Sequence, residues 1–256
     1  MRDLLFPSTK ALSEPGHLRL LHAAVATALG FALYGFSVGY WRSPMMGVFV
    51  AIKFPLLIAS TLACNGLLNG LLALLLGSGL SFRQSLHSLL NAFAISALIL
   101  GSLAPVTFFL AVNAPTPDSP QAQSAHAAYL MTHTCMIAIA GSVGVMKLRN
   151  LLKAWCPNRK VALSTLGAWI AGNAFIGAQL SWVLRPFFGS PGLEVAFLRD
   201  HPMRDGSFYE AVWLAFLHLL DVSGMSLIPA ILLSVLAAFI LVPIYQFYTK
   251  PQTPTP

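Results

Sequence analysis

Long apolar runs without charge decide what this chain can fold into. The run 20–40 contains no Asp, Glu, Lys or Arg, and about 20 apolar residues are enough for a helix to cross a bilayer. Six apolar runs follow one another, at 20–40, 46–76, 82–112, 127–146, 161–184 and 226–247, and Lys53 and Arg83 are the only charged residues within them. The sequence therefore predicts an all-α fold, a polytopic transmembrane helix bundle of about six spans that forms a single transmembrane domain over residues 1–256.

The composition supports this prediction and excludes other classes of protein. Hydrophobic residues make up 57% of the chain and charged residues only 9%, whereas about a quarter of a soluble domain is charged. The net charge of +7 does not indicate nucleic-acid binding, because the basic residues lie between apolar runs and not on a face with exposed aromatic residues. We expect the lipid bilayer and other membrane protein subunits as partners, and no nucleic acid.

The basic residues also predict an orientation. With the N-terminus inside, ten of the fifteen Lys and Arg residues fall on the cytoplasmic side, as the positive-inside rule requires. Both termini are then cytoplasmic, and the connections 113–123 and 185–207 are external, in what we expect to be a bacterial inner (plasma) membrane. Ser207 and Glu210 form a capping box. It predicts an interfacial helix over 208–222 within an external segment 185–222.

Small and polar residues recur within the apolar runs at steps of three or four. They are Gly35, Gly39, Asn65, Gly66, Asn69, Gly70, Gly172 and Asn173. Helices in lipid associate through such residues, because small side chains let two backbones approach closely. These positions predict either contacts within one bundle or a face that docks a partner subunit, and the sequence leaves both open.

One acidic residue lies where lipid is expected. Asp221 is the only Asp or Glu between residues 211 and 247. An unpaired carboxylate in lipid costs a few kcal/mol, so we expect Asp221 to find a basic partner. Arg185 is the first choice, because a guanidinium holds a carboxylate with two parallel hydrogen bonds, and Lys53 is the second. The alternative is that Asp221 lies in water at the interface.

No motif in the sequence names a reaction. HExxH and GxxxxGK[ST] are missing, and the three cysteines form no CxxC pair. His126 and His133 lie seven residues apart, so they share a helix face. They are the candidate ligands for a haem or pigment, although a structural role is the simpler interpretation. We expect no enzymatic activity, no metal site and no cofactor.

The segment Ser81-Phe82-Arg83-Gln84-Ser85-Leu86 follows an apolar hairpin and contains a capping box. In this respect the chain resembles the Yip family of small polytopic membrane proteins, over about residues 53–112. The resemblance implies a non-enzymatic organiser that recruits partners within a membrane. It carries over no functional residues.

Three functions follow from these observations. The first is a non-enzymatic scaffold or accessory subunit of a membrane protein assembly. The second is a small-solute or ion transporter or channel, although intramembrane charge is scarce and no inverted repeat is visible. Its polar pathway consists of Lys53, Asn65, Asn69, Asn173, Gln179 and Asp221. The third is a membrane subunit that holds a haem or pigment.

Overall fold

The computed structural model describes residues 17–202 and 206–223, and all regular secondary structure in these residues is helical. The helices are α3 (His17–Tyr40), α4 (Pro44–Leu75), α5 (Phe82–Asn113), α6 (Ala122–Trp155), α7 (Arg159–Val183) and α8 (Phe208–Ser223). Helices α3 to α7 are the five that are long and apolar enough to cross a membrane. The chain is therefore an integral membrane protein, and its described part is all-helical. The predicted span 226–247 and both termini lie outside the described residues, so the count of six spans and the orientation stay predictions.

Short polar side chains fix where the long helices begin. The first backbone N–H groups of a helix have no partner within it, and a Ser or Asn side chain ahead of the helix accepts from one of them. Ser43 does this for α4, next to Pro44 at the first helical position, and Asn158 does it for α7. Ser81 and Gln84 form both bonds of a capping box at the start of α5. The capping box predicted at this position is confirmed.

Helix α6 is longer than the predicted span 127–146. It continues to Trp155 and so includes Lys147 and Lys153, which we expected in a connection. Lys favours helices, and its positive charge is stabilised near a helix C-terminus by the helix dipole. The helix ends where Pro157 forces an extended backbone on Cys156, whose ψ is 146°.

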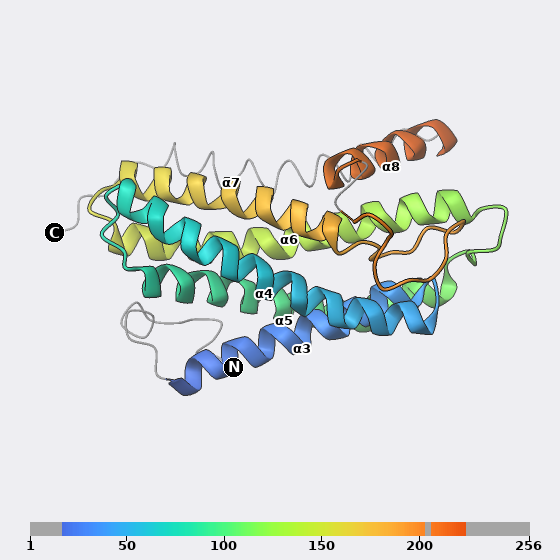
Figure 1. Ribbon diagram of the computed structural model, residues 1–256, viewed down its shortest axis with the longest axis horizontal. Coiled ribbons are helices and arrows are strands. Elements are labelled where there is room, and N and C mark those ends of the chain that lie inside the picture. Colours follow the sequence, from blue (N-terminus) through green and yellow to red (C-terminus); the bar gives the residue numbers. More distant parts are fainter. Residues whose placement is uncertain (1–16, 203–205, 224–256) are drawn as a thin grey trace.

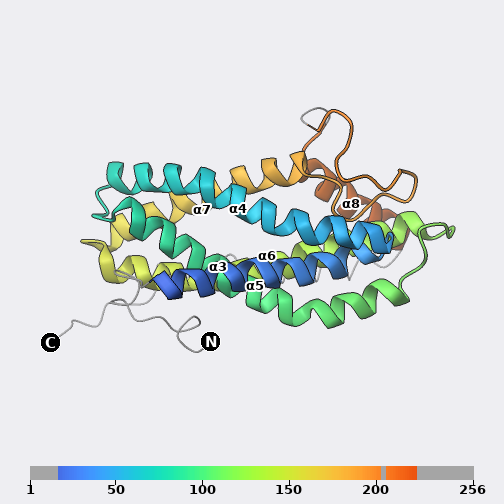
Figure 2. The same cartoon turned by 60° about the horizontal axis from the view of Figure 1, so that its bottom comes forward.

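The five long helices lie side by side along the long axis of the molecule and alternate in direction (Figures 1 and 2). We call the end with the connections 41–43, 114–121 and 184–207 the loop end, and the end with the turns 76–81 and 156–158 the turn end. Helix α3 packs against α4 and α5, whereas α4 also packs against α7. The short helix α8 packs against α6, with Ala215 beside Ala127 and Met131.

Helices α3 and α4 touch through their backbones. A Cβ atom added at Gly35 would lie 2.7 Å from the carbonyl oxygen of Val50, and one added at Gly39 would lie 2.5 Å from that of Met46. Real Cβ atoms do not approach a carbonyl oxygen so closely. The two glycines therefore set the distance between these helices, as small residues do in membrane bundles.

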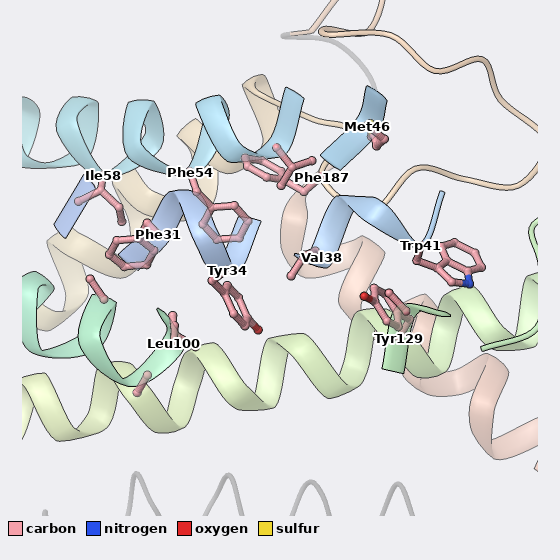
Figure 3. Close-up of a cluster of buried hydrophobic side chains, with 14 residues drawn as sticks. Phe31, Tyr34, Val38, Trp41, Met46, Phe54, Ile58, Leu100, Tyr129 and Phe187 are labelled. Carbon is pink, nitrogen blue, oxygen red and sulfur yellow. The ribbon is translucent and has the colours of Figure 1, made fainter. Parts of the chain in front are cut away.

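The main core lies toward the loop end and includes a residue of the connection 184–207, which we call the long loop. Figure 3 shows Phe187 of this loop beside Phe54 of α4. The two rings meet edge to face with their centroids 5.2 Å apart, a favoured geometry for aromatic pairs. Trp41 of the connection 41–43 also belongs to this core, and the other labelled members come from α3 to α6: Phe31, Tyr34, Val38, Met46, Ile58, Leu100 and Tyr129. The long loop is thus part of the packed structure.

Candidate functional site

Lys53 of α4 is fully buried, with an exposed fraction of 0%. Its Nζ donates a hydrogen bond of 2.8 Å to the carbonyl oxygen of Pro186 in the long loop. The same atom lies 5.8 Å from the ring centroid of Phe187 and 5.0 Å from that of Phe197. No carboxylate of the described residues pairs with it. Burial of an ammonium is costly, and the carbonyl and the two aromatic faces offset part of that cost.

Two arginines also bind carbonyl groups of the long loop. Nη2 of Arg42 donates to Leu193 O at 3.1 Å. Nη1 of Arg185 donates to Pro202 O at 2.8 Å and to Trp182 O at 2.9 Å. The Arg185 guanidinium also lies 4.1 Å from the ring centroid of Trp182, close enough for a cation–π contact. Basic side chains therefore hold the long loop against the loop end of the bundle.

Arg199, within the long loop, is half-buried. Its positive charge acts on Lys53. Burial and the neighbouring Arg185 guanidinium lower the pKa of Arg199, and the Asp200 carboxylate opposes this shift. A lowered arginine pKa still leaves the group charged at neutral pH. Three positive charges, on Lys53, Arg185 and Arg199, therefore lie close together at the loop end.

A second polar region lies between α4 and α7, nearer the turn end. Asn65 and Asn69 are 0% and 1% exposed, and neither atom of either amide has a hydrogen-bond partner. Four residues of helix separate them, so they project from one face. A Cβ added at Gly172 would lie 3.6 Å from Asn65 Oδ1 and 3.8 Å from Asn69 Oδ1. Both asparagine side chains therefore face α7 at this glycine.

Helix α7 adds further polar groups beside Gly172. Asn173 donates through Nδ2 to the carbonyl oxygen of Trp169 at 2.7 Å, but its own Oδ1 is buried without a partner. The Trp169 side chain is fully buried, and its Nε1 donates to the backbone oxygen of Asn69 at 3.0 Å. We call Asn65, Asn69, Gly172 and Asn173 the polar layer.

The polar layer keeps hydrogen-bonding capacity that the protein does not use. Each asparagine amide offers two donor hydrogens and one acceptor oxygen. A buried polar group without a partner costs about 1–3 kcal/mol, and polar side chains in membrane bundles normally bond across helices. Chemically, the arrangement is able to bind a small polar molecule or a cation through amide oxygens. It has no charged side chain of its own.

The two predicted histidine ligands lie two turns apart on α6. His133 is fully buried, with Nδ1 2.8 Å from the hydroxyl oxygen of Tyr34 and no partner at Nε2. Its ring packs against Tyr129 and Phe188, with centroid distances of 4.2 and 5.9 Å. His126 lies farther toward the loop end and contacts Trp41. Within residues 17–202 and 206–223, no three His, Cys, Asp or Glu side chains are grouped as metal ligands.

The predicted pair between Asp221 and Arg185 stays a prediction. Asp221 belongs to α8, but its side chain lies outside the described part of the chain. The predicted start of this helix at Phe208 is confirmed, because Ser207 Oγ accepts from the backbone N–H of Glu210 at 3.2 Å. Whether α8 lies in the membrane interface also stays a prediction.

The predicted small-residue positions all pack within the bundle. Gly35 and Gly39 face α4, as described above, and Gly172 faces the asparagines of that helix. Gly66 lies against Leu86 of α5, with 3.0 Å between a Cβ added at the glycine and Leu86 Cδ1. Gly70 lies against Phe82, with 2.6 Å to Cδ2 of that ring. These glycines therefore have neighbours inside the chain.

Sequence reasoning missed the part that the long loop takes in the site. Phe187, Phe188 and Phe197 stand among charged and Pro/Gly residues in the sequence. Three aromatic residues in a polar connection are a signal that the connection turns inward, since large apolar side chains are seldom left in water. Comparisons with protein family models, curated proteins and solved structures give no match. The resemblance to the Yip family stays untested, and the function has to be argued from the residues of this chain.

Proposed function

We propose that the chain is a non-enzymatic transporter or channel for a small solute, with a polar route along the face of α4 that meets α7. The observation that carries this proposal is the pair of buried, unpartnered amides of Asn65 and Asn69. An interface used only for packing is built from small residues and paired polar groups. Polar groups inside a membrane protein that lack such pairing are typical of a solute or ion pathway.

The polar positions of α4 extend over most of a membrane. Lys53, Thr61, Asn65 and Asn69 are all buried. Thr61, Asn65 and Asn69 follow at steps of four and lie within about 80° of one another around the helix, whereas Lys53 lies about 160° around the helix from Asn69. From Lys53 to Asn69 the helix rises about 24 Å, at 1.5 Å per residue, and the hydrocarbon core of a bilayer is about 30 Å thick. A route that joins Lys53 to the two asparagines therefore passes around α4 between the loop end and the turn end.

The proposed setting is a bacterial inner membrane, with six spans and both termini in the cytoplasm. The turn end then faces the cytoplasm and the loop end faces outward. Lys147, Arg149 and Lys153 lie in the part of α6 near the turn end, and Arg159 begins α7 there. This agrees with the preference of Lys and Arg for the cytoplasmic side.

The two other functions considered from the sequence have less support. A scaffold or accessory subunit needs a docking face, but the small residues expected to supply it pack inside the bundle. A pigment-holding subunit needs accessible ligands, but the His133 ring lies between Tyr129 and Phe188, with Nδ1 bonded to Tyr34.

Cysteine accessibility tests the route without knowledge of the solute. In a background without the native thiols of Cys64, Cys135 and Cys156, single cysteines replace Asn65 or Asn69. A charged methanethiosulfonate reagent then modifies the protein in membranes, and it needs water because the thiolate is the reactive form. We expect both positions to react. The control is Leu67→Cys in the same turns of α4, because the Leu67 side chain is 64% exposed on the outside of the bundle.

The three rates decide between a route and a dry interface. A route predicts that Asn65→Cys and Asn69→Cys react at least tenfold faster than Leu67→Cys, which faces lipid. If both asparagine positions stay unmodified while the variants are folded, the interface is dry and the proposed transport function is wrong.

A further inference from the structure

We propose that the loop end contains a binding site for a phosphate group, between Lys53 of α4 and Arg199 of the long loop. The proposal deepens the proposed function and rests on it for its biological role, because Lys53 is a buried polar residue of α4 nearer the loop end than Asn65 and Asn69. Binding itself is measurable on the purified protein without any transport assay.

Charges of opposite sign are separated at the loop end. The basic side chains there are buried or half-buried: Arg42, Lys53, Arg185 and Arg199. The acidic side chains of the described residues there are exposed: Asp118, Glu194, Asp200 and Glu210. The positive groups thus face the interior and the negative groups face outward. Beneath the long loop, the described residues leave an excess of positive charge that attracts an anion.

The polar atoms left without partners beneath the loop are hydrogen-bond donors. An ammonium has three N–H groups, and only the bond to Pro186 O is made by Lys53. The Nε1 of Trp182 and the Nε of Arg42 are buried donors without a partner. A site that offers donors and positive charge favours a ligand that accepts several hydrogen bonds.

Repulsion between the basic groups gives the second argument. The ring centroid of Phe197, two residues before Arg199, lies 5.0 Å from Lys53 Nζ. This segment of the long loop therefore brings a second positive charge toward Lys53, and the two like charges repel. An anion placed between Lys53 and Arg199 replaces this repulsion with two charge-assisted hydrogen bonds, which are stronger than neutral ones. A phosphate group suits the site better than a carboxylate, because it carries up to two negative charges and accepts from more donors at once.

A simpler interpretation is that the basic residues only hold the long loop through its carbonyl groups. Arg42, Lys53 and Arg185 each make such a bond. Arg199, in contrast, donates to no carbonyl group of the described residues and is half-buried in the long loop. A pure clamp predicts no response to phosphate, whereas a binding site predicts a response that grows with the logarithm of the phosphate concentration above the dissociation constant and depends on Arg199.

The test uses the full-length protein in nanodiscs and measures its thermal unfolding midpoint. In one arm the nanodiscs contain only phosphatidylcholine, and inorganic phosphate is titrated against chloride of equal ionic strength. In the other arm no phosphate is added, and part of the lipid is replaced by phosphatidylglycerol. We expect a rise of about 5 °C at roughly one hundred times the dissociation constant, which increases further with the logarithm of the phosphate concentration. A rise in the first arm identifies a free phosphate compound as the ligand, and a rise in the second arm alone identifies a lipid headgroup.

Matched variants show whether the response comes from this site. Arg199→Gln removes one charge from a half-buried loop position. We expect this variant to need at least ten times more ligand than the unchanged protein for the same rise in the unfolding midpoint. Lys53→Met is expected to abolish it. Arg83→Gln, at an exposed position of the turn end, keeps the response of the unchanged protein.

The proposal is wrong if the unchanged protein responds in neither arm, or if Arg199→Gln responds as strongly as Arg83→Gln. Because Arg199→Gln alone decides this, a failure of Lys53→Met to fold leaves the test intact. Phosphate binding together with unreactive cysteines at Asn65 and Asn69 would support the site and contradict the transport route. Reactive cysteines at Asn65 and Asn69 without phosphate binding would support the route and contradict the site.

Discussion

Lys53 Nζ lies 2.8 Å from the carbonyl oxygen of Pro186, so a lysine buried in a membrane-spanning helix is bonded directly to the loop that covers the bundle. The bond joins residues 133 positions apart and brings Phe187 into the core beside Phe54. The long loop is therefore placed by contacts with the spans. A change at Lys53 acts on the loop and on the start of the polar route together.

Lys53→Met tests this connection. The methionine keeps most of the apolar stem but leaves Pro186 O without its donor, and loss of a buried hydrogen bond of this kind costs about 1–3 kcal/mol. We expect faster amide hydrogen exchange across residues 184–202, measured by mass spectrometry. Arg83→Gln serves as the control, since Arg83 is an exposed residue of the turn end. Unchanged exchange in the loop of Lys53→Met would show that the bond does not hold it.

Asn69→Leu tests whether the polar layer is kept for function at the expense of stability. The substitution removes an amide that is buried without a partner and supplies an apolar side chain of similar size. We expect the free energy of unfolding to rise by about 1–3 kcal/mol, together with a loss of transport. Thermal unfolding in detergent measures the first effect. The control, Asn113→Leu, changes an exposed amide bonded to Phe109 O and is not expected to stabilise the protein.

Gly39→Ala tests the close contact between α3 and α4. Its added methyl group would lie 2.5 Å from Met46 O, and the backbones have to move apart to admit it. Overpacking of this kind costs about 1–3 kcal/mol, so we expect a lower unfolding temperature. Gly141→Ala is the matched control, because nothing lies within 4 Å of a Cβ added there. There we expect a gain of up to about 1 kcal/mol from the higher helix propensity of alanine. Equal effects of both substitutions would contradict the close contact.

The sequence predicts the helices well because the signals for them are local. The spans were expected at 46–76 and 82–112, and the helices run from Pro44 to Leu75 and from Phe82 to Asn113. Apolar length and capping residues act within a few positions of the chain. The error at the end of α6 is of the same local kind. Lys147 and Lys153 suggest a connection in the sequence, but basic residues also suit the last turn of a helix.

The site is harder to predict because it depends on which helices become neighbours. Asn65 and Asn69 were recognised as polar positions, and Gly172 as a packing position, but no sequence pattern joins them across about a hundred residues. The bond between Lys53 and Pro186 is a further case. Lys53 was expected as a partner for a carboxylate, and a backbone carbonyl of a distant loop carries no sequence signal, because every residue has one.

The pH dependence of Cys156 alkylation tests whether this thiol is buried at the turn end. Cys156 follows the last residue of α6 and is half-buried, and burial raises the pKa of its thiol. Alkylation requires the thiolate, so the rate should reach half its maximum at a higher pH than for a free cysteine. The measurement is the rate of iodoacetamide labelling against pH, in a variant that lacks Cys64 and Cys135. A profile equal to that of free cysteine would show that the thiol is not buried.

We expect the hydrogen bond between Tyr34 and His133 to couple the contributions of these two residues to the free energy of unfolding. The two side chains are fully buried and meet at 2.8 Å, so removal of either partner leaves a polar atom of the other unpaired. Tyr34→Phe and His133→Phe should each lower the free energy of unfolding by about 1–3 kcal/mol. The double substitution should cost clearly less than the sum, because it removes both polar groups. Unfolding of the four proteins under identical conditions measures this coupling. Additive costs would show that the bond contributes nothing of its own, and that the two residues stabilise the core through packing alone.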